Sequence, residues 1–322
     1  MERLQKGISP LFLVLCCVSS AGHAFELVNK HFYGSQNNSN KIDEYDSTGK
    51  FIDSLSLADV QDIRGMAFGP DRMLYAVTTQ PGNFLAYAVV VIDSLGAVKS
   101  TYLGQDGLNT NIVYGKIAFA KDGQFFVMGP LGLAAFTPGE TTSTLLPNSQ
   151  GFDVVGLPNG NLIFTTGNDI RELTTSGVSV RTITPSVRLD HATSIEYDPT
   201  SNQIFVTDLG QLAIQLKRLD GSTGFVNAQT SFNDGTDIVI TADGGLAIAS
   251  RFDAPSIFDL NLNLIGVFNH GVEGFLAQAQ FPDAPPPVRA PLGIWTIVLI
   301  TFLIPMTTPL HGRIPKKRGV AD

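Results

Sequence analysis

The side chains that could do chemistry gather near the starts of a repeated apolar strand. Six of them are the candidates for a ligand-binding site: Arg64, Lys116, Asp153, His191, Ser194 and Asp237. No Gly-x-Ser-x-Gly elbow surrounds a serine, and Asp190 and His191 are adjacent residues that rarely point together on a strand. The sequence therefore predicts binding through these residues and no catalytic set.

The elements that must position these residues recur along the chain. Each unit is an apolar strand, a tight polar turn such as Asp122-Gly123 or Asn159-Gly160, and a second apolar strand. The five copies lie at 63–77, 116–127, 153–164, 194–206 and 237–248. Their turns are 51, 37, 43 and 41 residues apart, a period typical of propeller blades. More polar hairpins follow at 89–98, 170–178 and 257–266. Two hairpins per unit predict a four-stranded blade.

An incomplete unit over 31–52 opens the repeat region, and residues 274–281 could supply its missing strand. Such closure would leave no open sheet edge between the first and last blades. The sequence thus predicts an all-β fold over 25–281, a six-bladed β-propeller of four-stranded blades. The alternative is another repetitive β architecture, such as a sandwich.

Alignment of the units on their turns places five residues at one position, called here the ring position, at one end of a central channel. They are Gly65, Lys116, Asp153, Ser194 and Asp237. Arg64 and His191 lie close by in sequence.

The units resemble NHL and SMP-30-like six-bladed propellers over most of residues 27–268. The resemblance rests on the Pro-Asp and Asp-Gly turns, on Leu74-Tyr75-Ala76-Val77 and on Tyr45-Asp46-Ser47-Thr48-Gly49-Lys50-Phe51-Ile52. SMP-30-like enzymes hold a divalent metal in the channel through Glu, Asn and Asp, so the resemblance implies Asp153 and Asp237 as ligands of Ca²⁺ or another divalent cation. Lys116 at the same level would oppose a cation, and the family's Glu near the first inner strand has no clear match. No cofactor is the first expectation, and a divalent cation is the alternative.

Charge and cysteine content narrow the partners. The net charge of the chain is −8. Because both ends are basic, the body between them is more negative than this. An acidic body repels phosphate backbones, so nucleic acid is not an expected partner. Both cysteines, Cys16 and Cys17, lie in the N-terminal apolar run, so disulfides and thiol chemistry are not expected in the body.

The N-terminus has the pattern of a secretory signal over residues 1–24. Arg3 and Lys6 precede an apolar stretch at 8–18, and small residues lead to cleavage after Ala24. An uncleaved anchor is the alternative.

The C-terminus has three parts. Residues 282–291 form a Pro-rich spacer, 292–310 carry no charge and are long enough to cross a bilayer, and 311–322 form a basic tail. The basic tail is expected on the cytoplasmic side, which places the body outside. This arrangement resembles the PEP-CTERM and IPTL-CTERM sorting signals of bacterial surface proteins, although neither Val-Pro-Glu-Pro nor Pro-Thr-Leu is present. A core helix of the body is the alternative.

Together these features predict an exported propeller, periplasmic or at the cell surface, anchored in the membrane by its C-terminal helix. The expected role is binding of a protein, glycan or small ligand rather than catalysis. The alternatives are a metal-dependent hydrolase, such as a lactonase, at the channel mouth, and a structural surface or matrix component.

Overall fold

The chain is described from a computed structural model. It divides into a compact unit over Met1–Phe281 and a second unit over Pro282–Asp322. The structure describes residues 25–35, 39–80, 83–104, 115–129, 131–137, 140, 142–183, 189–208, 214–220, 224–232, 235–250, 254–269 and 274–280. The predicted signal, spacer, membrane span and basic tail lie outside these residues. Among the described residues, no helix has the length and apolar character needed to cross a bilayer.

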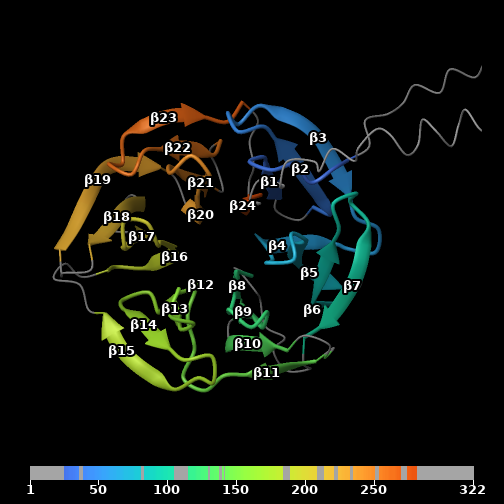
Figure 1. Cartoon of the computed structure of the whole chain (residues 1–322), viewed down its shortest axis with the longest axis horizontal. Helices are drawn as coiled ribbons and strands as arrows, with labels where there is room; N and C mark the ends of the chain where they lie inside the picture. Colours follow the sequence, from blue (N-terminus) through green and yellow to red (C-terminus); the bar gives the residue numbers. More distant parts are fainter. Residues whose placement is uncertain are drawn as a thin grey trace, which may run out of the picture. The chain divides into compact units, whose positions relative to one another are not determined.

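The strands form four-stranded antiparallel sheets arranged like blades around a central axis, where the sequence predicts the channel (Figure 1). From the channel outward, the first sheet is β24 (Leu276–Gln278), β1 (Phe32–Ser35), β2 (Lys41–Tyr45) and β3 (Phe51–Ser56). The second is β4 (Asp62–Phe68), β5 (Leu74–Gln80), β6 (Asn83–Ile92) and β7 (Val98–Leu103). The third is β8 (Ile117–Phe119), β9 (Phe125–Gly129), β10 (Gly132–Phe136) and β11 (Ser143–Leu145).

The remaining sheets repeat the same order. The fourth is β12 (Val154–Gly156), β13 (Leu162–Thr165), β14 (Ile170–Leu173) and β15 (Ser179–Ile183). The fifth is β16 (Ala192–Asp198), β17 (Gln203–Asp208), β18 (Ile214–Asp220) and β19 (Gly224–Phe232). The sixth is β20 (Gly235–Ile240), β21 (Leu246–Ser250), β22 (Ser256–Phe258) and β23 (Leu264–Val267). The prediction of an all-β propeller with four-stranded blades is confirmed.

The hairpin turns predicted from the sequence adopt the positive φ angles that such turns need. The residues Arg72, Gly123, Gly160, Asn202 and Gly244 occupy the first-hairpin turns with positive φ. In three of these turns an Asp or Asn side chain also accepts a hydrogen bond from the backbone N–H two residues on, as Asp122 does from Gln124 at 3.1 Å. These turns, and the second-hairpin turns such as 93–97, lie at one face of the propeller, called here the tight-turn face.

The ring of blades is closed by a strand from the far end of the body. β24 pairs antiparallel with β1, with Phe32 opposite Gln278 and Gly34 opposite Leu276. The last inner strand therefore belongs to the blade that opens the chain, as the sequence predicts. Closure of this kind removes the open edge that β1 would otherwise expose.

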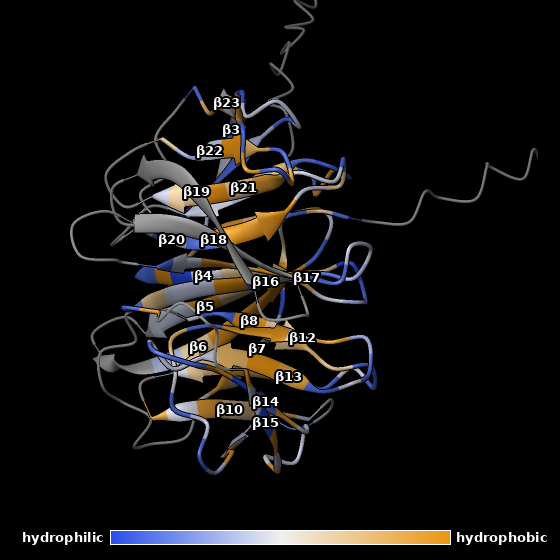
Figure 2. Ribbon diagram, turned by 90° about the vertical axis from the view of Figure 1, so that its left-hand side faces the viewer, coloured by the Kyte–Doolittle hydropathy of each residue, from blue (hydrophilic) through white to orange (hydrophobic). Residues whose placement is uncertain are grey.

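The core lies between the blades. Six hydrophobic clusters are present among the described residues, and each joins side chains of two neighbouring sheets. In one of them Tyr75 and Phe125 pack edge to face, with ring centroids 5.2 Å apart. Figure 2 shows hydrophobic strands between hydrophilic turns, the distribution expected when blade-to-blade burial holds the fold.

Candidate functional site in the channel

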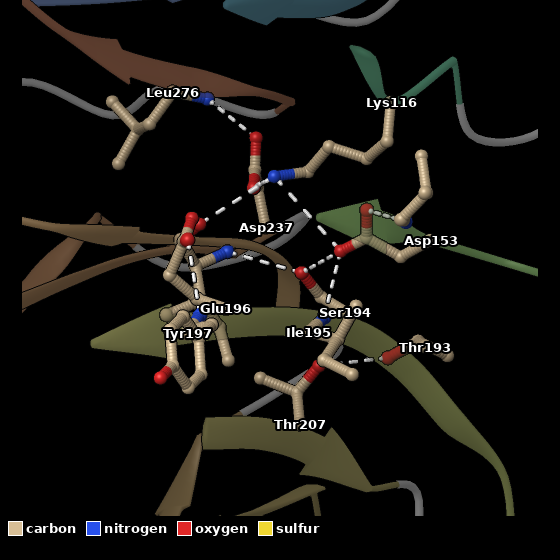
Figure 3. Close-up of polar contacts among 12 residues, drawn as sticks. Lys116, Asp153, Thr193, Ser194, Ile195, Glu196, Tyr197, Thr207, Asp237 and Leu276 are labelled. Atoms are coloured by element: carbon tan, nitrogen blue, oxygen red, sulfur yellow. Dashed lines mark hydrogen bonds and ion pairs between the residues drawn. The ribbon is translucent and has the colours of Figure 1, made fainter. Parts of the chain in front are cut away.

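The inner strands bring four of the six predicted site residues together (Figure 3). Lys116 and Asp153 directly precede β8 and β12, while Ser194 and Asp237 lie on β16 and β20. Ser194 and Asp237 each follow a β-bulge, at Ala192/Ser194 and at Gly235/Asp237. A bulge re-aims the next side chain, and here it directs both toward the neighbouring blade.

These four residues are buried rather than displayed at an open mouth. Asp153, Ser194 and Asp237 are 0% exposed, and Lys116 is 7% exposed. Charged groups at such depth require partners, because an unpaired buried charge is costly. These four residues must therefore be understood first through the contacts that they make with other residues of the chain.

The ring-position side chain of one blade accepts a hydrogen bond from the next blade. In each case the donor is the backbone N–H of the residue that follows the ring position of the next blade, or the corresponding residue of β24 in the first blade. This holds at three successive interfaces: Ile195 N donates to Asp153 Oδ2 at 2.7 Å, Ile238 N to Ser194 Oγ at 3.2 Å, and Leu276 N to Asp237 Oδ2 at 3.1 Å. Ser194 Oγ also donates to Asp153 Oδ2 at 2.6 Å. The set thus ties four consecutive blades together at the channel.

Lys116 breaks this pattern because an ammonium group can only donate. Its Nζ pairs with Asp237, donates to the carbonyl oxygen of Ile238 at 3.4 Å and lies 3.9 Å from Asp153 Oδ2. By this pattern the backbone N–H of Val154 would donate to the side chain at position 116. It donates instead to Asp153 Oδ1 at 2.6 Å. Lys116 therefore links its blade to a blade across the channel rather than only to its neighbour.

The electrostatics of the cluster are dominated by burial. Burial, together with repulsion from Asp153, raises the pKa of Asp237 to about 7, although Lys116 opposes the shift. Burial also raises the pKa of Asp153, against the attraction of Lys116 and its hydrogen bonds. Burial alone would lower the pKa of Lys116, but the carboxylates of Asp153 and Asp237 outweigh it and the net shift is upward. Lys116 therefore stays charged, while Asp153 and Asp237 hold a proton more readily than exposed aspartates do.

Glu196 is a fourth charged member that the sequence analysis did not select. It is partly buried on β16, two residues after Ser194. Burial raises its pKa to about 7, with Lys116 acting in the opposite direction. Alternate residues of a strand share a face, so the i, i+2 spacing from Ser194 was the signal that could have found it.

Gly65 and Arg64 lie at the interface between the second and third blades. A Cβ on Gly65 would overlap the carbonyl oxygen of Gly115, so this ring position needs glycine for close approach of two backbones. Gly115 N donates to the Arg64 carbonyl at 2.7 Å. The Arg64 guanidinium pairs with Asp62 at 2.5 Å on its own strand, so this ion pair is separate from the lysine–carboxylate cluster.

His191 lies apart from the cluster. It is exposed just before β16, has a φ of 138° and packs its ring 4.9 Å from the ring of Phe152. A histidine in this region of φ is strained, and such strain often occurs at binding sites. His191 is therefore the most exposed of the six predicted site residues.

The donor set does not fit a divalent cation as it is arranged. Asp153 and Asp237 converge, but the ammonium of Lys116 lies between them and takes the place that a cation would need. Within the part of the chain that the structure describes, no group of three or more His, Cys, Asp or Glu side chains is placed to hold a metal. The metal-ligand assignment of Asp153 and Asp237 therefore lacks support from the geometry.

Comparisons with known proteins bear on the fold. No protein-family model and no curated protein matches the sequence. Among solved structures, a chain of the nidogen/laminin complex is similar at a TM-score of 0.58 and 15% identity, over 78% of this chain and 99% of that one. A streptogramin B lyase is similar at 0.51 and 18%, over 73% and 76%. A functionally unknown protein from Desulfotomaculum acetoxidans is similar at 0.52 and 11%, over 79% and 100%. At these identities the likeness shows the propeller fold alone.

Proposed function

We propose that this chain is an exported β-propeller that acts as a binding module, anchored in a membrane by residues 292–310. The observation that carries the binding role is the internal use of the channel residues. Asp153, Ser194 and Asp237 are engaged in blade-to-blade hydrogen bonds, and Lys116 neutralises part of their charge. Residues held in this way support the scaffold, which leaves the exposed surfaces for a partner.

The breadth of function on this fold agrees with a binding role. One similar propeller was solved in a nidogen/laminin complex, while another is a streptogramin B lyase. The proposed partner is a protein or a glycan, because an extended propeller face suits a large ligand. The acidic body makes nucleic acid an unsuitable partner.

Export and tethering are tested by topology. We expect the full chain, made in a bacterial host, to be membrane-bound, with its body digested by protease added outside spheroplasts. Changing Leu299 and Leu303 to lysine should release the body, since each charge near the middle of a span costs roughly 2.5–3.5 kcal/mol. Asp283→Lys, in the spacer, is the matched control and should remain bound. A body protected in the cytoplasm, or retention of the double-lysine variant, would refute this anchoring.

A second candidate is a hydrolase of the lactonase kind, and one observation favours it. His191 is exposed just before β16 and has a strained φ of 138°. The position of Lys116 argues against the metal that this reading requires. The hydrolase therefore predicts a bound divalent cation that the binding module does not.

A further inference from the structure

Several exposed apolar side chains of the propeller lie at the tight-turn end of its outer strands, whereas Leu103, Leu145 and Val267 lie at the other end. Each of the four second-hairpin turns that the structure describes in full leads into an outer strand at the tight-turn face. Beside each turn lie large apolar side chains in water. The rim, as we call this set, comprises Phe51, Leu95, Val98, Val178, Leu264 and Ile265.

Three side chains of the rim are more than half exposed to solvent. Leu95 is 71% exposed, Ile265 65% and Val178 61%. They belong to three different blades, so the rim follows the circumference rather than forming one patch. Single exposed apolar residues are ordinary, but their recurrence at the same place in four blades points to a common surface.

The body's last described residues lie at the same face. Lys30 N donates to the Ala279 carbonyl at 2.7 Å, and the Lys30 ammonium pairs at 3.1 Å with Asp243, which lies in the tight turn 241–245. Gln278 also accepts a hydrogen bond from Ala242 in that turn. The chain thus leaves the propeller at the tight-turn face, and the 19 uncharged residues of 292–310 follow within a short length of sequence.

We propose that the tight-turn face contacts the phospholipid bilayer, with the rim side chains entering its interfacial layer. This inference rests on the proposed membrane tether. The tether would hold the face close to the lipid, so modest apolar contacts suffice because they form at high effective concentration. The opposite face then points away from the membrane and is the one presented to a partner.

Site-directed fluorescence of the full chain tests this proposal. The background carries Cys16→Ser and Cys17→Ser, and single cysteines at Leu95, Val178 or Ile265 carry an environment-sensitive bimane probe. The vesicles are phosphatidylcholine, because the turns carry aspartates that anionic lipid would repel. We expect a blue shift and strong quenching by nitroxide-labelled lipid at all three rim positions.

Leu131 and Asn168 are the control positions. Both are exposed in loops at the opposite face, between β9 and β10 and between β13 and β14. Probes there should stay unshifted and unquenched. Vesicle-bound protein with unquenched rim probes, or with equal quenching on both faces, would overturn the rim contact but leave the tether standing. Failure of the chain to float with vesicles would overturn the tether, and the rim contact with it.

A charge substitution provides an independent readout. Leu95→Glu, Val178→Glu and Ile265→Glu alter exposed side chains, so the fold should persist. Combined, they should abolish most of the quenching of a probe at Val98, whereas Leu131→Glu should not change it. Unchanged quenching in the combined variant would contradict a role for the rim.

Discussion

Lys116→Met is expected to lower the free energy of unfolding by about 3–5 kcal/mol at pH 8, the range seen when a buried ion pair loses one partner. Methionine keeps the length of the side chain but removes the positive charge that lies beside the buried carboxylates of Asp153 and Asp237. The measurement is urea unfolding of the full chain, followed by the fluorescence or circular dichroism of the body.

Lys121→Met is the matched control. Lys121 is an exposed lysine in the tight turn of the same blade, so its replacement should change stability by no more than about 0.5 kcal/mol. Adding Asp237→Asn to Lys116→Met should recover part of the loss, because the residues are directly coupled. Equal stability of Lys116→Met and Lys121→Met would show that the lysine does not hold the blades together.

Stability is also expected to fall as the pH rises from about 4.5 to 7, by on the order of 3 kcal/mol for each of Asp237 and Glu196. Asp237 and Glu196 have folded pKa values raised to about 7, while the unfolded chain releases these protons near pH 4. The folded protein therefore binds more protons in this window. The contribution is fully present below the unfolded pKa and is lost as the pH reaches the folded pKa.

Surface carboxylates act in a different window. Hydrogen bonds from the turn backbone and from neighbouring side chains lower the pKa of Asp93 and of Asp259, so their contribution is lost only at more acidic pH. The measurement is the unfolding midpoint in urea at steps from pH 4.5 to 8. Glu196→Gln combined with Asp237→Asn should flatten the profile. A flat profile in the unchanged protein, or an unchanged slope in the variant, would be inconsistent with protons held in the channel.

Much of the fold could be predicted from local sequence because its signals are local. Turns such as Asp122-Gly123 and Asn159-Gly160 specify hairpins, and the number of residues between successive turns predicts the length of one blade. The equivalence of Lys116, Asp153, Ser194 and Asp237 also followed from that spacing, and the structure brings all four to the channel. Whether any of them binds a ligand stays a prediction.

The use of those residues could not be predicted in the same way. The bulges before Ser194 and Asp237 decide which face each side chain takes, and a shift of one residue reverses the face. The reach of Lys116 to Asp237 joins residues far apart in sequence, across a channel whose width depends on blade packing. Lys116, which the sequence analysis weighed against a metal, became the central cation of the cluster.

In this structure Lys116, rather than a metal ion, is the cation held by the channel carboxylates. The most direct measurement is the metal content of the purified full chain after equilibration with Ca²⁺ or Zn²⁺ and removal of unbound ion. The structure predicts no stoichiometric metal and no rise in Tm with either ion. Stoichiometric metal that disappears in both Asp153→Asn and Asp237→Asn would contradict it and favour the hydrolase.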